Sequence, residues 1–223
     1  MSRFFAISDI HGCFEPFYEL VVKIIDLKKS DRLVLLGDYI DRGYESREVI
    51  DFIMDLMSGG YDVTPLAGNH EVMLLDAYHD PGMIPLWHMN SGITTQFSFD
   101  IGNIRNLETR YLDFFKNLDY YLLIGDYYFV HAGFNDDLAD PFTDRQYMIW
   151  ESRGSYKNPV FAGKTIIHGH RPKQTGYVKM LIKEKSNFIP IDTGCVYGAE
   201  MGYGFLSALD INSMELISVP CGQ

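Results

Sequence analysis

Short apolar runs alternate with amphipathic segments along the first third of the chain, a pattern typical of an α/β protein. Three runs predict buried strands, and the segments between them carry apolar residues at helical spacing. The predicted strands are Arg3–Ser8, Arg32–Leu36 and Val63–Leu66, and the predicted helices are Glu15–Lys28 and Glu45–Met57. The pair Gly59-Gly60 is expected to end the second helix.

This alternation stops at Asp76–Gly102, where prolines and glycines interrupt the pattern and predict a cap or loop region. Ile104–Leu118 returns to helical spacing, and from Tyr120 onward the chain reads as mostly β. The predicted later strands are Tyr127–Val130, Lys164–Ile167, Val178–Ile182, Phe188–Ile191, Phe205–Leu209 and Met214–Val219. Without repeats or linkers in the sequence, we expect one domain over 1–223 with a cap region at about 76–118.

The composition limits the classes of partner. The chain has 223 residues, a formal net charge of -11, and basic residues that are scattered along it. A protein that binds long nucleic acids usually has a basic stripe, so such a partner is not expected. An acidic protein can still hold a small phosphate where metal cations supply positive charge. Three widely spaced cysteines, a short N-terminal apolar run and the lack of any long apolar stretch favour a cytoplasmic protein without membrane contact.

Polar clusters follow five of the predicted strands. They are Asp9-Ile10-His11, the heptapeptide 37–43, Gly68-Asn69-His70-Glu71, His131-Ala132-Gly133 and His168-Gly169-His170. Because the carboxyl ends of strands in α/β folds converge on one crevice, we expect the five clusters to share one location. Carboxylate, imidazole and amide ligands together suit manganese, iron or zinc.

In this order, the clusters resemble the DxH, GDxxDRG, GNHE, H(A/G)G and GH motifs of the phosphoprotein phosphatases, within the calcineurin-like metallophosphoesterases. The likeness spans roughly Phe4 to Leu209 and is strongest to bacterial and bacteriophage lambda-type serine/threonine phosphatases. It implies an α/β fold in which a β-sandwich is flanked by helices (α/β/β/α), with the active site at the carboxyl ends of strands.

The resemblance also implies a role for each motif residue. It implies two divalent metals, with Mn²⁺ favoured and Fe or Zn as alternatives, and attack on phosphorus by a metal-bridging hydroxide. Its metal ligands would be Asp9, His11, the bridging Asp38, Asn69, His131 and His170. His70 would be the general acid, oriented by Asp41. Arg42 would grip phosphate oxygens, with Asn69 adding an amide hydrogen bond.

Two further arginines are candidates for phosphate contact. Arg153 ends a segment, Met148–Arg153, that resembles a stretch of lambda-type phosphatases but places the arginine one position later. Arg171 directly follows His170. His168 is expected to be structural because it faces away from His170.

Other segments are interpreted as structural. Trp87 and Asn90-Ser91-Gly92 are expected to pack in the cap near the mouth of the site, and His79 and His88 are not expected to bind metal. An extra loop is expected at 199–204.

The sequence favours a serine/threonine protein phosphatase, with tyrosine dephosphorylation as an added activity. The alternative is a symmetrical diadenosine tetraphosphate hydrolase or another small-nucleotide phosphohydrolase, because the core motifs do not separate substrates. The expected partner is a phosphorylated protein or a small phosphoester. A third class, a binding module that has lost its chemistry, is disfavoured because all the ligand and catalytic positions carry functional residues.

Overall fold

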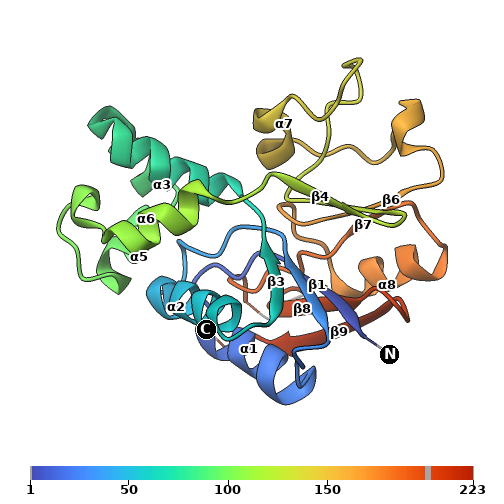
Figure 1. Cartoon of the computed structure of the whole chain (residues 1–223), viewed down its shortest axis with the longest axis horizontal. Coiled ribbons are helices and arrows are strands. Elements are labelled where there is room, and N and C mark those ends of the chain that lie inside the picture. Colours follow the sequence, from blue (N-terminus) through green and yellow to red (C-terminus); the bar gives the residue numbers. More distant parts are fainter. Residues whose placement is uncertain (1, 199–201, 223) are drawn as a thin grey trace.

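The computed structural model describes residues 2–198 and 202–222, and it shows two β-sheets that pack face to face (Figure 1). The larger sheet has the strand order β3-β2-β1-β8-β9, and the smaller has the order β4-β5-β6-β7. The strands are β1 (Phe4–Ile7), β2 (Arg32–Leu35), β3 (Asp62–Pro65), β4 (Tyr121–Ile124), β5 (Tyr127–Val130), β6 (Thr165–His168), β7 (Phe188–Pro190), β8 (Phe205–Asp210) and β9 (Glu215–Pro220). The predicted α/β sandwich is therefore confirmed. The loop expected at 199–204 lies partly outside the described residues.

Strand direction explains why the polar clusters meet. Strands β1, β2 and β3 pair in parallel, and so do β5, β6 and β7. In each sheet the carboxyl ends therefore lie at one edge, as in other parallel sheets. The two edges are joined where His131, after β5, donates from Nδ1 to the carbonyl of Leu36, after β2, at 2.8 Å.

Successive side chains on the central strands point alternately into two different hydrophobic cores. On β1, Phe5 and Ile7 belong to the core beneath the helices, whereas Ala6 belongs to the core between the sheets. On β2, Leu33 and Val34 divide in the same way. Strands buried on both faces read as near-continuous apolar runs, which is why the sequence pattern predicted them.

Helices cover the outer faces and form a separate group beside the site. Helices α1 and α2 lie under the larger sheet, while α3, α5 and α6 lie together at the upper left of Figure 1. The helical elements are α1 (Phe14–Tyr18), the π-helical η1 (Glu19–Ile24), α2 (Ser46–Ser58), α3 (Asn69–His79), η2 (Pro81–Met83), α4 (Ile84–Met89), α5 (Gly92–Ser98), η3 (Ile104–Asn106), α6 (Thr109–Lys116), α7 (Arg145–Trp150), η4 (Pro159–Phe161) and α8 (Thr175–Lys183).

The expected cap region contains helices, and one expected strand is wrong. The interval Asp76–Gly102 is largely helical, because α3 continues to His79 and short helices α4 and α5 follow. The predicted strand Val178–Ile182 lies within helix α8. Its β-branched residues suggested a strand, yet Val178, Leu181 and Ile182 stand at i, i+3 and i+4, which is also helical spacing.

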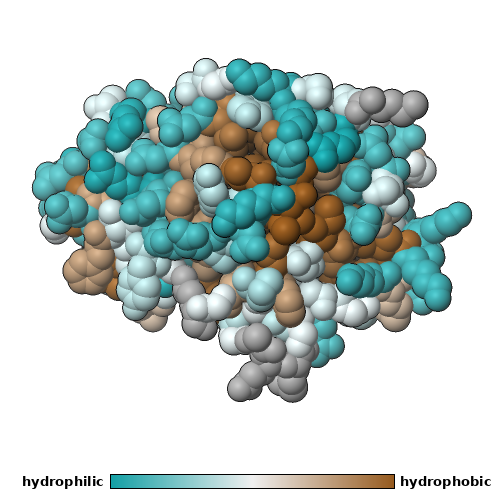
Figure 2. Space-filling model, turned by 90° about the horizontal axis from the view of Figure 1, so that it is seen from below, coloured by the Kyte–Doolittle hydropathy of each residue, from teal (hydrophilic) through white to brown (hydrophobic). Residues whose placement is uncertain are grey.

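The outer surface is mixed in polarity. Figure 2 shows hydrophobic surface gathered in one area of the face seen from below, the side on which α1 and β9 lie in Figure 1. Val22 and Ile24 of η1 are among the exposed hydrophobic side chains. None of the described helices is long and apolar enough to cross a membrane.

Substituting Gly37 and Gly60 tests how closely the loops after β2 and β3 approach each other. Gly37 has φ +96°, and a Cβ there would lie 2.5 Å from the backbone nitrogen of Gly68. Gly60 has φ +81° with open space around it. We expect Gly60→Ala to lower the free energy of unfolding by about 1 kcal/mol through backbone strain alone. Gly37→Ala should cost about 1–3 kcal/mol more through overlap, measured by chemical denaturation. Equal losses would contradict the close approach of the loops after β2 and β3.

Candidate active site

The loops that carry the predicted site residues have strained backbones. Several non-glycine residues adopt positive φ, a region that side chains other than glycine rarely occupy. Those in the predicted site are Asp9, His11, Asp38, Asp41, Arg42 and His170. Such strain persists only where the surrounding structure enforces it, and it concentrates at functional sites.

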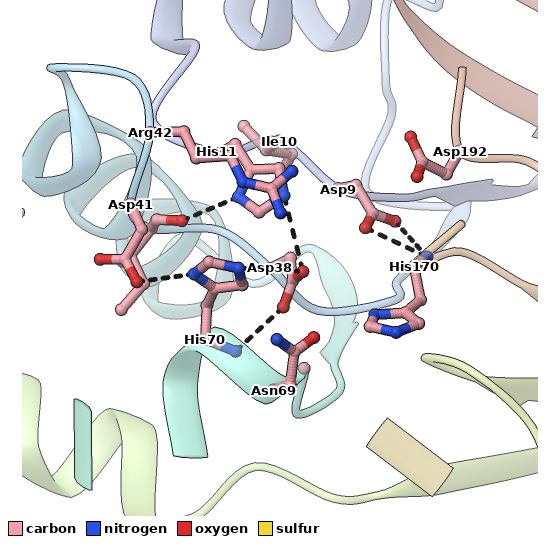
Figure 3. Close-up of polar contacts among 12 residues, drawn as sticks. Asp9, Ile10, His11, Asp38, Asp41, Arg42, Asn69, His70, His170 and Asp192 are labelled. Carbon is pink, nitrogen blue, oxygen red and sulfur yellow. Dashed lines mark hydrogen bonds and ion pairs between the residues drawn. The ribbon is translucent and has the colours of Figure 1, made fainter. Parts of the chain in front are cut away.

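Asp38 lies at the centre of the site (Figure 3). Its Oδ2 lies 3.5 Å from Nε2 of His11, 3.5 Å from Nε2 of His131 and 3.9 Å from Nε2 of His70. Its Oδ1 accepts a hydrogen bond of 3.2 Å from the backbone N–H of His70. Burial alone raises the pKa of Asp38, but the surrounding imidazoles outweigh it and hold the pKa below its usual range.

Backbone contacts orient two of these imidazoles. His11 donates from Nδ1 to the carbonyl of Ile40 at 3.0 Å, as His131 does to Leu36. With the proton on Nδ1, each ring turns the lone pair of Nε2 toward Asp38. His131 Nε2 also faces Asn69 Oδ1 at 3.0 Å and His170 Nδ1 at 3.1 Å. Ring nitrogens held in this way by a backbone carbonyl are typical of metal ligands.

Two groups of described side chains could each hold a metal ion. One comprises His11, Asp38 and His70, and the other comprises Asp38, His131 and His170, with ligand atoms within 4.8 Å of one another in each group. Asp38 is common to both. Asp9, a predicted ligand, lies in neither group; its carboxylate accepts hydrogen bonds of 3.1 and 3.0 Å from the backbone N–H of His170 and one from Ser8 Oγ.

Charge favours a cation here. Asp9, Asp38 and Asp192 are buried carboxylates on neighbouring loops, and Figure 3 shows Asp192 beside Asp9. Burial and the charge of Asp38 raise the pKa of Asp9 to about 6, while burial and Asp9 raise that of Asp192 further. Burial lowers the pKa of His170 to about 3, so that ring is neutral and can ligate. Because buried like charges are costly unless compensated, the residues fit divalent metal ions.

His70 and Asp41 form a buried pair. Nδ1 of His70 lies 2.6 Å from Oδ2 of Asp41. Burial lowers the pKa of His70, but the charge of Asp38 and the bond to Asp41 outweigh it and leave the pKa raised. Trp87 Nε1 donates to Asp41 Oδ2 at 3.0 Å, and Thr95 Oγ1 donates to Asp41 Oδ1 at 2.6 Å. The sequence analysis interpreted Trp87 only as cap packing and assigned no role to Thr95.

Glu71 braces two of the site loops. It is fully buried, and its carboxylate accepts backbone N–H groups of Gly68 at 2.9 Å, Asp38 at 2.9 Å and Tyr39 at 2.8 Å. It therefore ties the loop after β2 to the start of α3. The GNHE motif placed Glu71 near the site, but its role was not foreseen from the sequence.

The predicted phosphate-binding arginines lie in different surroundings. Arg42 donates to the hydroxyl of Tyr197 at 3.4 Å and lies near His11 and Asp41 in Figure 3. Arg153 donates to Tyr147 at 2.7 Å and pairs with Asp137, whereas Arg171 lies 3.4 Å from Glu151.

The chain is similar to known proteins over nearly its whole length. The chain is 26% identical to the asymmetrical bis(5′-nucleosyl)-tetraphosphatase of Anoxybacillus flavithermus, over 96% of this chain and 92% of the relative. It is also 26% identical to the symmetrical enzyme of Chromobacterium violaceum, over 97% and 95%. A crystal structure of a candidate diadenosine tetraphosphatase superposes with a TM-score of 0.68 at 22% identity, covering 98% of this chain and 93% of that one. Residues 2–197 match calcineurin-like phosphoesterases, and because that match contains all five polar clusters, the chain belongs to this family of metal-dependent enzymes.

Proposed function

We propose that this metallophosphoesterase hydrolyses bis(5′-nucleosyl) tetraphosphates. The buried His70–Asp41 pair beside a carboxylate shared by two candidate metal groups supports phosphoryl transfer to water. The choice of substrate rests on the two tetraphosphatases that align along nearly their whole length. The sequence favoured a protein phosphatase, but these relatives support its alternative. One relative cleaves symmetrically and the other asymmetrically, so the bond cleaved is left to experiment.

Two divalent metals fit the proposed site. By the motif resemblance, Asp9 and His11 would hold the first metal, Asn69, His131 and His170 the second, and Asp38 both, although Asp9 lies outside the two candidate groups. When bound, such metals supply Lewis acidity and a water of lowered pKa. We favour Mn²⁺, with Fe or Zn as alternatives, because the ligands are carboxylate, imidazole and amide groups.

The chain's own residues would then orient the phosphate and manage one proton. Arg42 carries a planar guanidinium suited to paired contacts with phosphate oxygens, and Asn69 can add an amide donor. His70 donates from Nδ1 to Asp41, which leaves Nε2 directed toward Asp38 and the candidate metals. The charge of Asp38 and the bond to Asp41 raise the pKa of His70 despite its burial, so we assign Nε2 to carry a proton and not to bind metal, although His70 belongs to one candidate metal group. That proton can pass to the oxygen that leaves phosphorus when the P–O bond breaks.

A substrate comparison tests the proposal. Metal-stripped protein is assayed with and without Mn²⁺ on diadenosine tetraphosphate, a phosphoserine peptide and a phosphotyrosine peptide. We expect Mn²⁺-dependent cleavage of the dinucleotide, with the highest kcat/KM of the three, and chromatography of the nucleotides identifies the bond broken. Phosphate release from the peptides alone would overturn the proposal in favour of a protein phosphatase.

Replacing the proposed general acid should slow chemistry selectively. His70→Ala is expected to lower kcat by about 10²–10⁴-fold. The loss should be larger for an alkyl phosphate than for p-nitrophenyl phosphate, whose leaving group needs less protonation. His79→Ala, at the exposed end of the same helix, serves as the control. Full turnover of the alkyl phosphate by His70→Ala would remove His70 from this role.

Thr95 is expected to act through Asp41. Thr95→Val keeps the shape of the side chain but removes its hydroxyl. That hydroxyl donates to Asp41 Oδ1 and accepts from the backbone N–H of Asp41. We expect kcat to fall about tenfold, as for the loss of one hydrogen bond to a charged group, with the same dependence on leaving group as His70→Ala. The control is Thr94→Val on the same helix, which removes a hydrogen bond from the Thr94 hydroxyl to the carbonyl of Ser91. If Thr95→Val lowered kcat equally for all leaving groups, its role would be structural only.

A further inference from the structure

A cavity lies beside the loop that carries His170. It has a volume of about 250 Å³, and its lining includes Arg153, Arg171, Lys173, His168, Tyr177 and Phe188. His168 and Arg171 flank Gly169-His170 in the sequence, so this loop forms a wall of the cavity and also supplies a candidate metal ligand. Both arginines that the sequence analysis nominated for phosphate contact line this one cavity.

His168 points to a missing partner. The side chain is 1% exposed, and its ring stacks on Phe188 with centroids 4.0 Å apart. Nδ1 donates to the carbonyl of Gly169 at 3.0 Å, so Nε2 carries a lone pair and must accept. Among the described residues, this Nε2 is the one buried side-chain nitrogen or oxygen without a hydrogen-bond partner. Leaving such an atom unpaired costs about 1–3 kcal/mol, so a small rotation of the ring that brought Nε2 to a hydrogen-bond donor in the cavity would be favourable.

The cavity also carries positive charge. Arg153 and Arg171 each face one carboxylate, of Asp137 and Glu151, and a guanidinium has five N–H donors, so both retain donors for another group. Lys173 forms no ion pair with any carboxylate of the described residues. Three cations against two carboxylates leave an excess suited to phosphate oxygens.

We propose that this cavity binds a nucleoside end of the substrate. The three cations would contact phosphate oxygens, and His168 Nε2, once the ring turned toward the cavity, would accept a hydrogen bond from a sugar hydroxyl or a base amino group. The ring of Tyr177, 45% exposed, offers a face on which a base can stack. This inference rests on the proposed function and adds to it the position of one of the two nucleosides, next to the loop that carries His170.

Two substitutions test whether the cavity binds the substrate. Lys173→Gln removes a cation, and His168→Phe removes the acceptor while keeping a ring against Phe188. Lys179→Gln, on the exposed side of α8, removes the same charge outside the cavity. For each variant, kcat/KM is measured with Mn²⁺ on diadenosine tetraphosphate and on p-nitrophenyl phosphate. We expect Lys173→Gln and His168→Phe to lower the ratio of the two values about tenfold, mainly through KM for the dinucleotide.

The outcomes separate this inference from the proposed function. An unchanged ratio in Lys173→Gln, with the dinucleotide still hydrolysed by the wild-type protein, would overturn the cavity and leave the function standing. An equal fall in Lys179→Gln would also overturn it, because the effect would then be one of net charge. If the wild-type protein did not cleave the dinucleotide at all, the proposed function would fail first and the inference with it. Should His168→Phe not fold, the result for Lys173→Gln decides.

Discussion

The site depends on one constraint, the burial of the Asp38 carboxylate between three imidazoles where the two sheets meet. A buried carboxylate is tolerated only when it is paired or hydrogen-bonded. The three rings come from separate segments. His11 follows β1, His70 lies in the first turn of α3 after β3, and His131 follows β5 of the other sheet. Asp38 therefore lies where segments of both sheets meet, and it accepts a hydrogen bond from the backbone N–H of His70. Burial raises the pKa of Asp9 and of Asp192 close by, and a divalent cation bound here would favour their ionised forms.

The rest of the architecture holds this arrangement in place. Glu71 ties three backbone N–H groups of two loops, and the carbonyls of Ile40 and Leu36 set the orientation of His11 and His131. Gly169 allows the closest approach, since a Cβ there would lie 1.8 Å from Ser8 Oγ and 2.1 Å from Asp9 Oδ2. Packing between the sheets keeps the strand ends together, so the strain of positive φ at the ligand loops is sustained by the cores below them.

The sequence was sufficient for the parts of the fold that are buried on both faces. Continuous apolar runs predicted β1 and β2, and the motif residues after them were expected at one edge because parallel strands end together. Helix α3 was missed because its first turn, from Asn69, consists of polar motif residues. The contacts of Trp87 and Thr95 with Asp41 could not be predicted, since they join positions 46 and 54 residues apart through tertiary packing. The strand predicted at Val178 failed because a short apolar run fits both periods.

Substrate choice must come from residues outside this core. Asp38, His70 and their ligand neighbours act on a phosphoryl group whatever is attached to it, so they serve a phosphoprotein and a dinucleotide equally well. A tetraphosphate with two nucleosides is long, and its ends must reach beyond the metal groups in opposite directions. Arg42 with Tyr197 lies at the His11 and Asp41 side of the site, whereas the cavity of Arg171, Lys173 and His168 adjoins the His170 side. Both flanks pair a cation with an aromatic ring, so under the proposed function each flank would offer a contact for phosphate oxygens and a face for a base.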